Sequence, residues 1–351
     1  MEIKLLQARA TRVLNRLVWN VRHLRARRTS GTSELKVVRS NVPGYGSVWE
    51  YTSDSFVENE FGFIMDANGD LWEESLVPNF GLEKAMWRIA VPGPFRIDKM
   101  RSNPPPKVRY YEEVVSIRHL WEWNYYHFFM DVLPQLQILE QAGYSGSYPV
   151  VIGGYANELR WTSEVLNMGS LANREWIIQD DFLVSAKRVL GAKVTTAYGD
   201  RMSFVQKLLD APTPVQDSRR RVFLVRAKGT SRSLVNHDDA TSLLGEYGFE
   251  VVDTAAMSVA EQQKVFSETR HLVALHGAGM TNMIFRYGAP MSVLELHGHS
   301  HVSQDFKRMA EAAGWHFDRL SGPANDGDYR HVAFSIDLPE LRERIVSLLK
   351  N

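Results

Sequence analysis

"RHLVALHGAGMTNMIFRYG", residues 270–288, decides the expected fold, because an apolar strand runs into a glycine turn and then into a helical pattern. Six residues of this turn are predicted to bind a ligand: His276, Gly277, Ala278, Gly279, Thr281 and Asn282. Since Gly277 and Gly279 lack a Cβ, the backbone can turn tightly and approach a ligand, and the first N–H groups of the helix favour a phosphate. Asn282 stands where the dinucleotide-binding fingerprint has its third glycine, so the pattern is not that fingerprint. A tight turn without a ligand is the alternative.

Strands and helices alternate on both sides of this stretch. One alternating series starts at residue 122 and a second at residue 221, which predicts an α/β protein with parallel, doubly wound sheets. The segment "DAPTPVQDSRRR" at 210–221 has two prolines and a charge run, as linkers do. We therefore expect an N-terminal α/β domain over 31–213 and a C-terminal Rossmann-like domain over 214–351. For the last helix, "LPELRERIVSLLKN", we consider packing back on the N-terminal domain.

Cap residues support this division into elements. Asn236 is expected to cap one helix with its side chain, and Gly248 to end the same helix. Ser258 and Glu261 have the spacing of a capping box at the start of the next helix. The sequence "DANGD" reads as a hairpin turn in the N-terminal region.

The composition narrows the class of protein. Lys+Arg and Asp+Glu both total 41 in 351 residues, so no overall basic character points to nucleic acid. The chain has no cysteine, which excludes disulfides and thiolate metal sites. No stretch approaches the roughly 20 apolar residues of a membrane span, and arginines interrupt the apolar core that a signal peptide would need. We therefore expect a cytoplasmic protein.

The N-terminal segment, residues 1–30, is a predicted basic amphipathic helix. Its first 28 residues carry eight Lys/Arg and a single acid, Glu2. On a helical wheel the apolar and basic residues fall on opposite faces, a shape that suits an anionic membrane surface. The helix would then hold the protein peripherally at the inner face of the cytoplasmic membrane. The alternative is a helix docked on its own domain.

A basic strand end precedes the glycine turn. The stretch "FLVRAKGTSRSLVN" puts Arg226, Lys228 and Arg232 directly after a strand. Arginine suits bidentate phosphate recognition, and in a parallel sheet this strand end lies on the same side as the His276–Gly277 turn. We predict a diphosphate site here, with a solvated basic loop as the alternative.

A polar face lies on the predicted helix of "NYYHFFMDVLP". Asn124, His127 and Asp131 fall within about 60° of one another on a helical wheel. A His and an Asp one turn apart can act as a base and the group that orients it. The sequence leaves open which of the two is the base, and a purely structural pair is the alternative. Pro134 is expected to kink or end the helix.

Glu295 on the strand "SVLELHG" could accept hydrogen bonds from ribose hydroxyls, or could form a salt bridge. Metal sites have little support. The alternating His297, His299 and His301 read as a polar loop, and the "DGD" at 326–328 lies in a turn. No metal or other cofactor is expected.

These motifs together resemble glycosyltransferase family 61 in order and spacing, over roughly residues 120 to 297. They are "NYYHFFMDVLPQL", "FLVRAKGTSRSLVN", "EYGFEVVD", "AEQQKVFSETRHLVALHGAGMTNMIF" and "SVLEL". The family resembles the enzymes that place xylose or N-acetylglucosamine on plant glycans and animal proteins.

The resemblance implies a GT-B architecture, with two Rossmann-like domains facing across a cleft, and an inverting, metal-independent transfer. It implies that Arg226 and Arg232 hold the diphosphate, that the 277–282 loop takes the phosphates and the sugar, and that Glu295 holds the ribose. It also implies that the acceptor faces the N-terminal-domain motif: Asn124, His127 and Asp131.

The expected function is therefore transfer from a nucleotide diphosphate sugar, UDP being the expected nucleotide, to a hydroxyl of a glycan. The basic N-terminal helix favours a membrane-associated acceptor, such as a capsule or lipopolysaccharide precursor or another lipid-linked saccharide. The alternatives are another nucleotide-sugar enzyme such as an epimerase, and a module that binds a glycan or nucleotide without chemistry.

Overall fold

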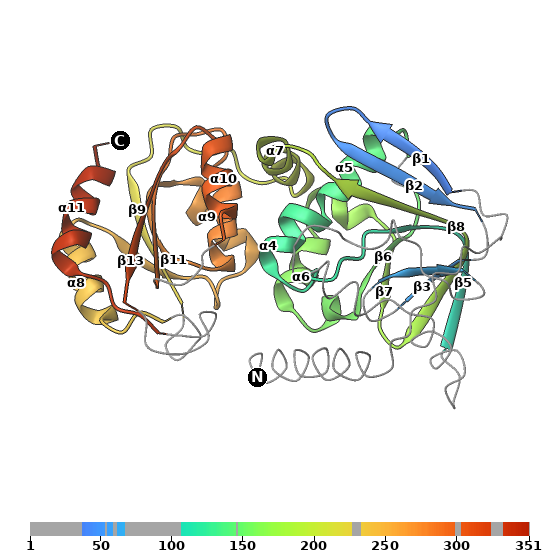
Figure 1. Ribbon diagram of the computed structural model, residues 1–351, viewed down its shortest axis with the longest axis horizontal. Helices are drawn as coiled ribbons and strands as arrows, with labels where there is room; N and C mark the ends of the chain where they lie inside the picture. Colours follow the sequence, from blue (N-terminus) through green and yellow to red (C-terminus); the bar gives the residue numbers. More distant parts are fainter. Residues whose placement is uncertain are drawn as a thin grey trace. The chain divides into compact units, whose positions relative to one another are not determined.

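The computed structural model describes residues 37–52, 55–58, 62–66, 107–144, 147–226, 233–298, 303–323 and 333–350. These residues form two sheets, each rich in parallel strands and accompanied by helices (Figure 1). The predicted α/β class with two Rossmann-like sheets is confirmed. Residues 1–30, with the predicted amphipathic helix, and residues 67–70 of the predicted "DANGD" turn lie outside the described residues.

The N-terminal sheet is mixed. Its strands are β1 (Val37–Val42), β2 (Gly46–Tyr51), β3 (Ser55–Val57), β4 (Ile64–Asp66), β5 (Lys107–Ser116), β6 (Val150–Gly153), β7 (Trp176–Gln179) and β8 (Phe182–Val194). The main order is β1-β2-β8-β5-β6-β7, and β3 pairs with both β4 and β8. The neighbours from β8 through β5 and β6 to β7 are parallel, whereas the pairings of β1 to β4 are antiparallel. Helix α5 (Pro134–Gln141) and the short η3 (Gly154–Asn157) belong to the same unit.

The C-terminal sheet is parallel throughout. Its strands are β9 (Arg220–Val225), β10 (Glu250–Asp253), β11 (Thr269–Leu275), β12 (Ser292–Gly298) and β13 (His316–Gly322), in the order β10-β9-β11-β12-β13. The chain leaves β9 toward β10 on one side and returns to β11 on the other. Such a reversal opens a ligand crevice at the carboxyl ends of the two central strands. Those ends are the basic segment after β9 and the glycine turn after β11.

Helices cover both faces of this sheet (Figure 1). They are α8 (His237–Glu246) and α11 (Leu338–Leu348) on one face, and α9 (Val259–Ser267), η5 (Ala278–Arg286) and α10 (Asp305–Ala312) on the other. Because both faces are covered, the central strands are almost continuously apolar. Helix α11 buries Leu341, Ile345 and Leu348 in the core of this sheet, together with Leu243 and Leu294. Its apolar residues, three and four positions apart, therefore face their own sheet, and packing of this helix on the N-terminal domain stays a prediction.

The caps agree with the sequence in two cases of three. Ser258 and Glu261 form the capping box of α9, and Gly248 follows α8 with a φ of +73°. Asn236 precedes α8, but the prediction that its side chain caps the helix was wrong. The Asn236 amide instead pairs with the backbone of Ile336, donating to the carbonyl at 2.8 Å and accepting from the N–H at 3.1 Å. The backbone of Ile336 therefore takes the place of the first N–H groups of α8 as the partner of the Asn236 side chain.

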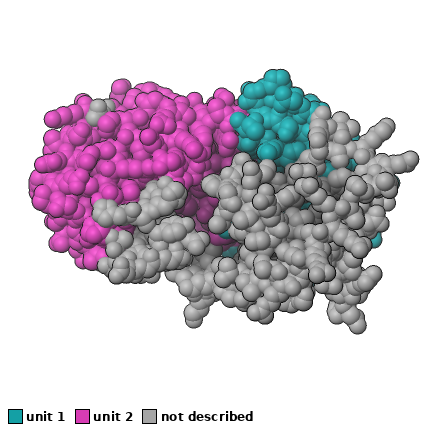
Figure 2. All heavy atoms as spheres, in the orientation of Figure 1, with its two compact units in different colours: residues 1–122, 135–158, 174–195 teal, residues 123–134, 159–173, 196–351 magenta. Residues whose placement is uncertain are grey.

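Two segments from the first half of the chain pack with the C-terminal sheet. The compact units are residues 1–122, 135–158 and 174–195, and residues 123–134, 159–173 and 196–351 (Figure 2). The second unit thus includes α4 (Tyr125–His127), η2 (Phe128–Val132), α6 (Arg160–Leu166), η4 (Gly169–Asn173) and α7 (Tyr198–Leu208). The bounds 31–213 and 214–351 stay a prediction.

Aromatic side chains hold the first of these segments in place. Phe129 of η2 contacts Phe285 of η5 edge-on, with 6.2 Å between ring centroids. Tyr125 and Phe128 both contact Trp161 of α6, at 5.1 and 5.2 Å. These aromatic contacts each add to the burial of apolar area. This packing explains why the segment that carries Asn124, His127 and Asp131 is grouped with the second unit.

None of the helices in the described ranges is long and apolar enough to span a bilayer.

The buried His271 on β11 makes the stability of the fold depend on pH. His271 is only 8% exposed. This burial, and after it the positive charges of Arg270 and Arg221, lowers the pKa of its imidazole to about 4. The unfolded chain, with an ordinary histidine pKa of about 6.5, takes up the proton first as the pH falls. We expect stability to be lost as the pH falls from about 6.5 to about 4. His271→Gln should lose less stability over this window.

The measurement is urea unfolding of wild type and His271→Gln at pH 7.5, 6, 5 and 4.5. An equal loss of unfolding free energy in both proteins would contradict the assignment.

Candidate active site

The carboxyl ends of β9 and β11 bring Arg226 against the glycine turn. The Nη1 of Arg226 donates to the carbonyl of His276 at 3.4 Å. A Cβ added to Gly277 would lie only 1.9 Å from that nitrogen. Gly277 is therefore needed because a guanidinium packs on the backbone here. Lys228 and Arg232, the other two predicted cations, lie outside the described residues.

The helix predicted after the turn is present and is a 3₁₀ helix, η5. The N–H of Met280 already bonds the carbonyl of Gly277 at 2.9 Å, the tighter spacing of this helix type. Ala278 begins the helix, and a Cβ on Gly279 would meet Thr254 at an ordinary 3.4 Å. The phosphate contact predicted for these N–H groups stays a prediction.

Asn282 links the turn to two other helices. It is 1% exposed, as is Thr281, so both lie inside the unit. The Asn282 amide donates to Gln262 Oε1 at 2.8 Å and to the Gly279 carbonyl at 3.0 Å, and its oxygen accepts from the Tyr125 hydroxyl at 2.9 Å. The sequence predicted a donor contact for Thr281 and Asn282. The structure shows a buried hub between η5, α9 and α4.

Glu295 is buried completely at 0% exposure and engages two basic side chains. Its Oε1 lies 2.5 Å from His276 Nδ1, and its Oε2 lies 2.5 Å from Arg319 Nε. Burial alone would raise the pKa of Glu295, but the hydrogen bonds and charges of His276 and Arg319 outweigh it and hold the pKa below its usual range. The salt-bridge alternative of the sequence is thus present. The ribose contact stays a prediction.

The predicted polar face of residues 124–134 lies on the short helix α4 and the π-helix η2 that follows it. Asn124 is the N-cap of α4 and accepts from the N–H groups of Tyr126 and His127, at 3.0 and 3.4 Å. In η2 the N–H of Leu133 bonds the carbonyl of Phe128 at 2.9 Å, and Pro134 starts the next helix. His127 Nδ1 and Asp131 Oδ2 lie 2.8 Å apart, as the spacing predicted. The acceptor contact expected of Asn124 stays a prediction beside its capping role.

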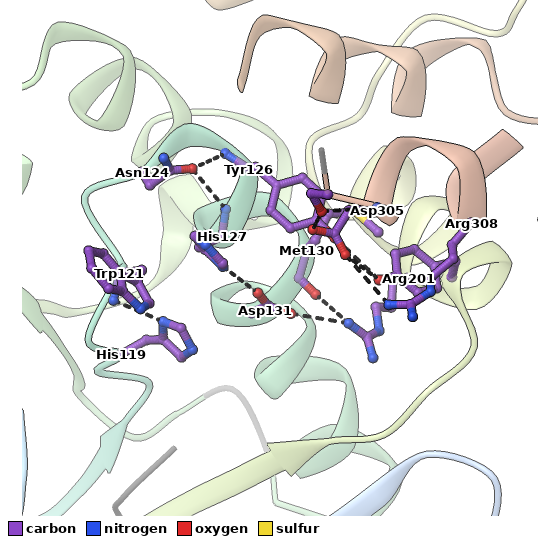
Figure 3. A network of polar contacts seen from close by, with 12 residues as sticks. His119, Trp121, Asn124, Tyr126, His127, Met130, Asp131, Arg201, Asp305 and Arg308 are labelled. Carbon is purple, nitrogen blue, oxygen red and sulfur yellow. Dashed lines mark hydrogen bonds and ion pairs between the residues drawn. The ribbon is translucent and has the colours of Figure 1, made fainter. Parts of the chain in front are cut away.

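Arg201 of α7 completes this group and was missed in the sequence. Its Nη1 donates to Asp131 Oδ1 at 3.1 Å (Figure 3). The arginine lies 70 residues from Asp131 in the chain, so no local spacing could identify the pair.

A row of rings connects the two histidines within the second unit. Tyr126 contacts His127 at 5.3 Å and Phe306 at 5.6 Å, and Phe306 contacts His276 at 5.5 Å, all edge-on. The Tyr198 hydroxyl donates to Asp305 Oδ1 at 3.1 Å. Two imidazole–carboxylate pairs, His127 with Asp131 and His276 with Glu295, therefore lie in one compact unit.

The site falls inside a stretch with known relatives: residues 125–294 match the family model Glycosyltransferase 61. The chain carries a glycosyltransferase family 61 domain. No curated protein matches the chain to a significant degree.

The match makes the protein a glycosyltransferase and confirms the resemblance drawn from the motifs. The matched range begins at Tyr125, so it includes the His127–Asp131 pair, the basic strand end and the glycine turn. Sugar transfer requires a sugar donor and an acceptor.

Within its described ranges, the glycosyltransferase gathers no three His, Asp or Glu side chains closely enough to hold a metal ion. His297 ends β12 with its Nδ1 2.7 Å from the carbonyl of Gly298, and burial lowers its pKa. His299, His301 and the "DGD" of 326–328 lie outside the described residues.

Removing the charge of Glu295 should destabilise the glycosyltransferase strongly. Glu295→Gln keeps the size of the side chain but leaves His276 and Arg319 without their buried counter-ion, which costs about 3 kcal/mol of unfolding free energy. The measurement is urea unfolding at pH 7.5. The matched control is Glu246→Gln, which breaks an exposed pair with Arg342 and should have little effect. Equal effects of both changes would contradict the role assigned to Glu295.

Proposed function

We propose that this glycosyltransferase moves a sugar from a nucleoside diphosphate sugar, with UDP as the nucleotide, to a hydroxyl of a glycan, with inversion and without a metal ion. One observation carries the proposal. Arg226 lies against Gly277 at the reversal point of the C-terminal sheet, in the same compact unit as the His127–Asp131 pair. A cationic strand end and an imidazole–carboxylate pair are the two groups that the transfer needs.

The leaving diphosphate gains negative charge as its bond to the sugar breaks. Arg226 supplies a fixed positive charge at the strand ends, and the sequence adds Lys228 and Arg232 directly after it. His276 donates through Nδ1 to the Glu295 carboxylate, which orients its ring. The positive charges of Arg226, Lys228 and Arg232 stabilise the leaving diphosphate, as a divalent metal ion does in other sugar transfers. On this ground we propose a metal-independent reaction.

His127 is the better base of the two candidates. Asp131 uses one oxygen for His127 and the other for Arg201. Because a carboxylate only accepts hydrogen bonds, the Nδ1 of His127 carries the proton of their contact. Its Nε2 is then the basic atom, with Asp131 fixing the tautomer and the ring orientation.

The reaction is a single displacement. The acceptor hydroxyl gives its proton to His127 Nε2 while its oxygen bonds the anomeric carbon. The bond from that carbon to the diphosphate oxygen breaks on the opposite face, and the electron pair leaves with the nucleoside diphosphate. Attack opposite to the leaving group inverts the anomeric configuration.

The acceptor we propose is a membrane-associated glycan, such as a capsule or lipopolysaccharide precursor or another lipid-linked saccharide. The support is the basic amphipathic pattern of residues 1–30, which suits the anionic inner face of a cytoplasmic membrane. The protein would then act in the cytoplasm, bound peripherally to that surface.

Loss of either member of the His127–Asp131 pair should abolish transfer and spare donor binding. His127→Ala removes the base and Asp131→Asn removes its orientation, so each should lower kcat by roughly 100-fold or more. The measurement is UDP release from a panel of UDP-sugars with simple glycoside acceptors. Donor binding is checked by thermal unfolding, because a ligand at 100 times its Kd stabilises the native state by about 2.7 kcal/mol.

Near-full activity of both variants would rule out this assignment. Product formation without any acceptor would favour the epimerase alternative. UDP binding without turnover across all acceptors would favour the binding module.

The two glycines of the turn should differ in their effect on donor binding. Gly277→Ala puts a methyl group onto the Arg226 guanidinium, which must move away from the proposed diphosphate site. Losing one charge-assisted contact should weaken UDP binding about tenfold. Gly279→Ala, whose Cβ meets only ordinary contacts, is the matched control. Calorimetric titration with UDP measures both, and equal affinities would count against Arg226 as a diphosphate ligand.

A further inference from the structure

Arg201 binds three groups around the proposed base from one side chain. Its Nη1 donates to Asp131 Oδ1 and to the carbonyl of Met130, both at 3.1 Å (Figure 3). Its Nε donates to the carbonyl of Thr196 at 2.8 Å. The side chain is only 12% exposed, and its guanidinium carbon lies 5.2 Å from the Tyr198 ring centroid. An arginine held by four partners is a rigid donor.

The local backbone explains why Arg201 is needed at this place. In an α-helix the N–H of residue 134 would bond the carbonyl of Met130, but Pro134 has no N–H. In the π-helix η2, the N–H of Leu133 bonds the carbonyl five residues back, of Phe128, and not the carbonyl four residues back as in an α-helix. Arg201 donates to the carbonyl that Pro134 leaves without its helical donor, and with the same nitrogen it holds the adjacent carboxylate.

We infer that Arg201 is a positioning residue for the transfer: it fixes the Asp131 carboxylate against His127. The inference rests on the proposed function, in which His127 is the base. A guanidinium in contact with Asp131 shares the negative charge of that carboxylate, so removing it is a change that His127 can report in an experiment.

Two tyrosines and one ion pair of the same unit also lie near this pair. Burial raises the pKa of Tyr126 and of Tyr198, so both hydroxyls stay neutral at ordinary pH. Asp305 and Arg308 of α10 have opposite charges and lie 3.8 Å apart, so their fields partly cancel. Arg201 contacts the Asp131 carboxylate directly.

The test compares Arg201→Gln, which removes the charge, with Arg201→Lys, which keeps the charge but loses the planar fork. Arg220→Gln is the matched control, because Arg220 also bonds two carboxylates, of Glu250 and Glu268, but at the amino end of β9. The first readout is the pKa of His127 by NMR on histidine-labelled protein, with the signal assigned through His127→Gln. The second is the pH profile of UDP release from the UDP-sugar that wild type uses.

In Arg201→Gln we expect the pKa of His127 to rise by about one unit, the acidic limb of kcat/KM to move up equally, and kcat to fall at least tenfold. Arg201→Lys should keep the wild-type pKa and lose part of kcat. Arg220→Gln should change neither. An unchanged His127 pKa and acidic limb in Arg201→Gln would overturn the inference. If that variant does not fold, full kcat in Arg201→Lys would overturn it.

The two proposals fail separately. If wild type transfers no sugar but Arg201→Gln still raises the pKa of His127, the effect of Arg201 on the pair stands and the proposed function falls. If transfer depends on His127 but Arg201→Gln leaves its pKa and the pH profile unchanged, only the role of Arg201 falls.

Discussion

The candidate site depends on one partly buried hydrogen bond, from the Tyr125 hydroxyl to the Asn282 amide oxygen. The two residues are 157 positions apart, and the bond joins the helix that carries His127 to the helix that follows the glycine turn. The Asn282 Nδ2 also donates to Gln262 Oε1, so both the oxygen and the nitrogen of the Asn282 amide have hydrogen-bond partners. Together with the aromatic packing of Phe129 and the Arg201 contacts to Met130 and Asp131, this bond holds the segment 123–134 on the unit.

The same arrangement of charges occurs twice around that contact. Glu295 lies between His276 and Arg319, and Asp131 lies between His127 and Arg201. In each case a guanidinium holds one carboxylate oxygen, so that the other is fixed for the imidazole. The two differ in exposure, since Glu295 is fully buried whereas Asp131 and His127 are partly exposed. In the proposed function, the partly exposed pair is the one that exchanges a proton with the acceptor.

Much of the fold follows from local pattern. The run of apolar strands and capped helices predicts the parallel C-terminal sheet, because period and cap chemistry depend on neighbours within a few residues. The His127–Asp131 pair could be predicted for the same reason, since residues four apart face one another on a helix. Asn236 shows the limit of such reasoning. Its position was right, but its amide found a partner 100 residues away.

The sequence by itself therefore determined the α/β class, the family, the glycine turn after β11 and the imidazole–carboxylate pair, all of which are written in short stretches of chain. Only the tertiary structure decided that this pair lies in the same unit as the glycine turn, that Arg201 and Arg319 hold the two carboxylates, and that Gly277 makes room for Arg226. The physical reason is that these contacts join segments tens of residues apart. Their geometry comes from how aromatic and apolar faces pack, and no spacing in the sequence specifies it.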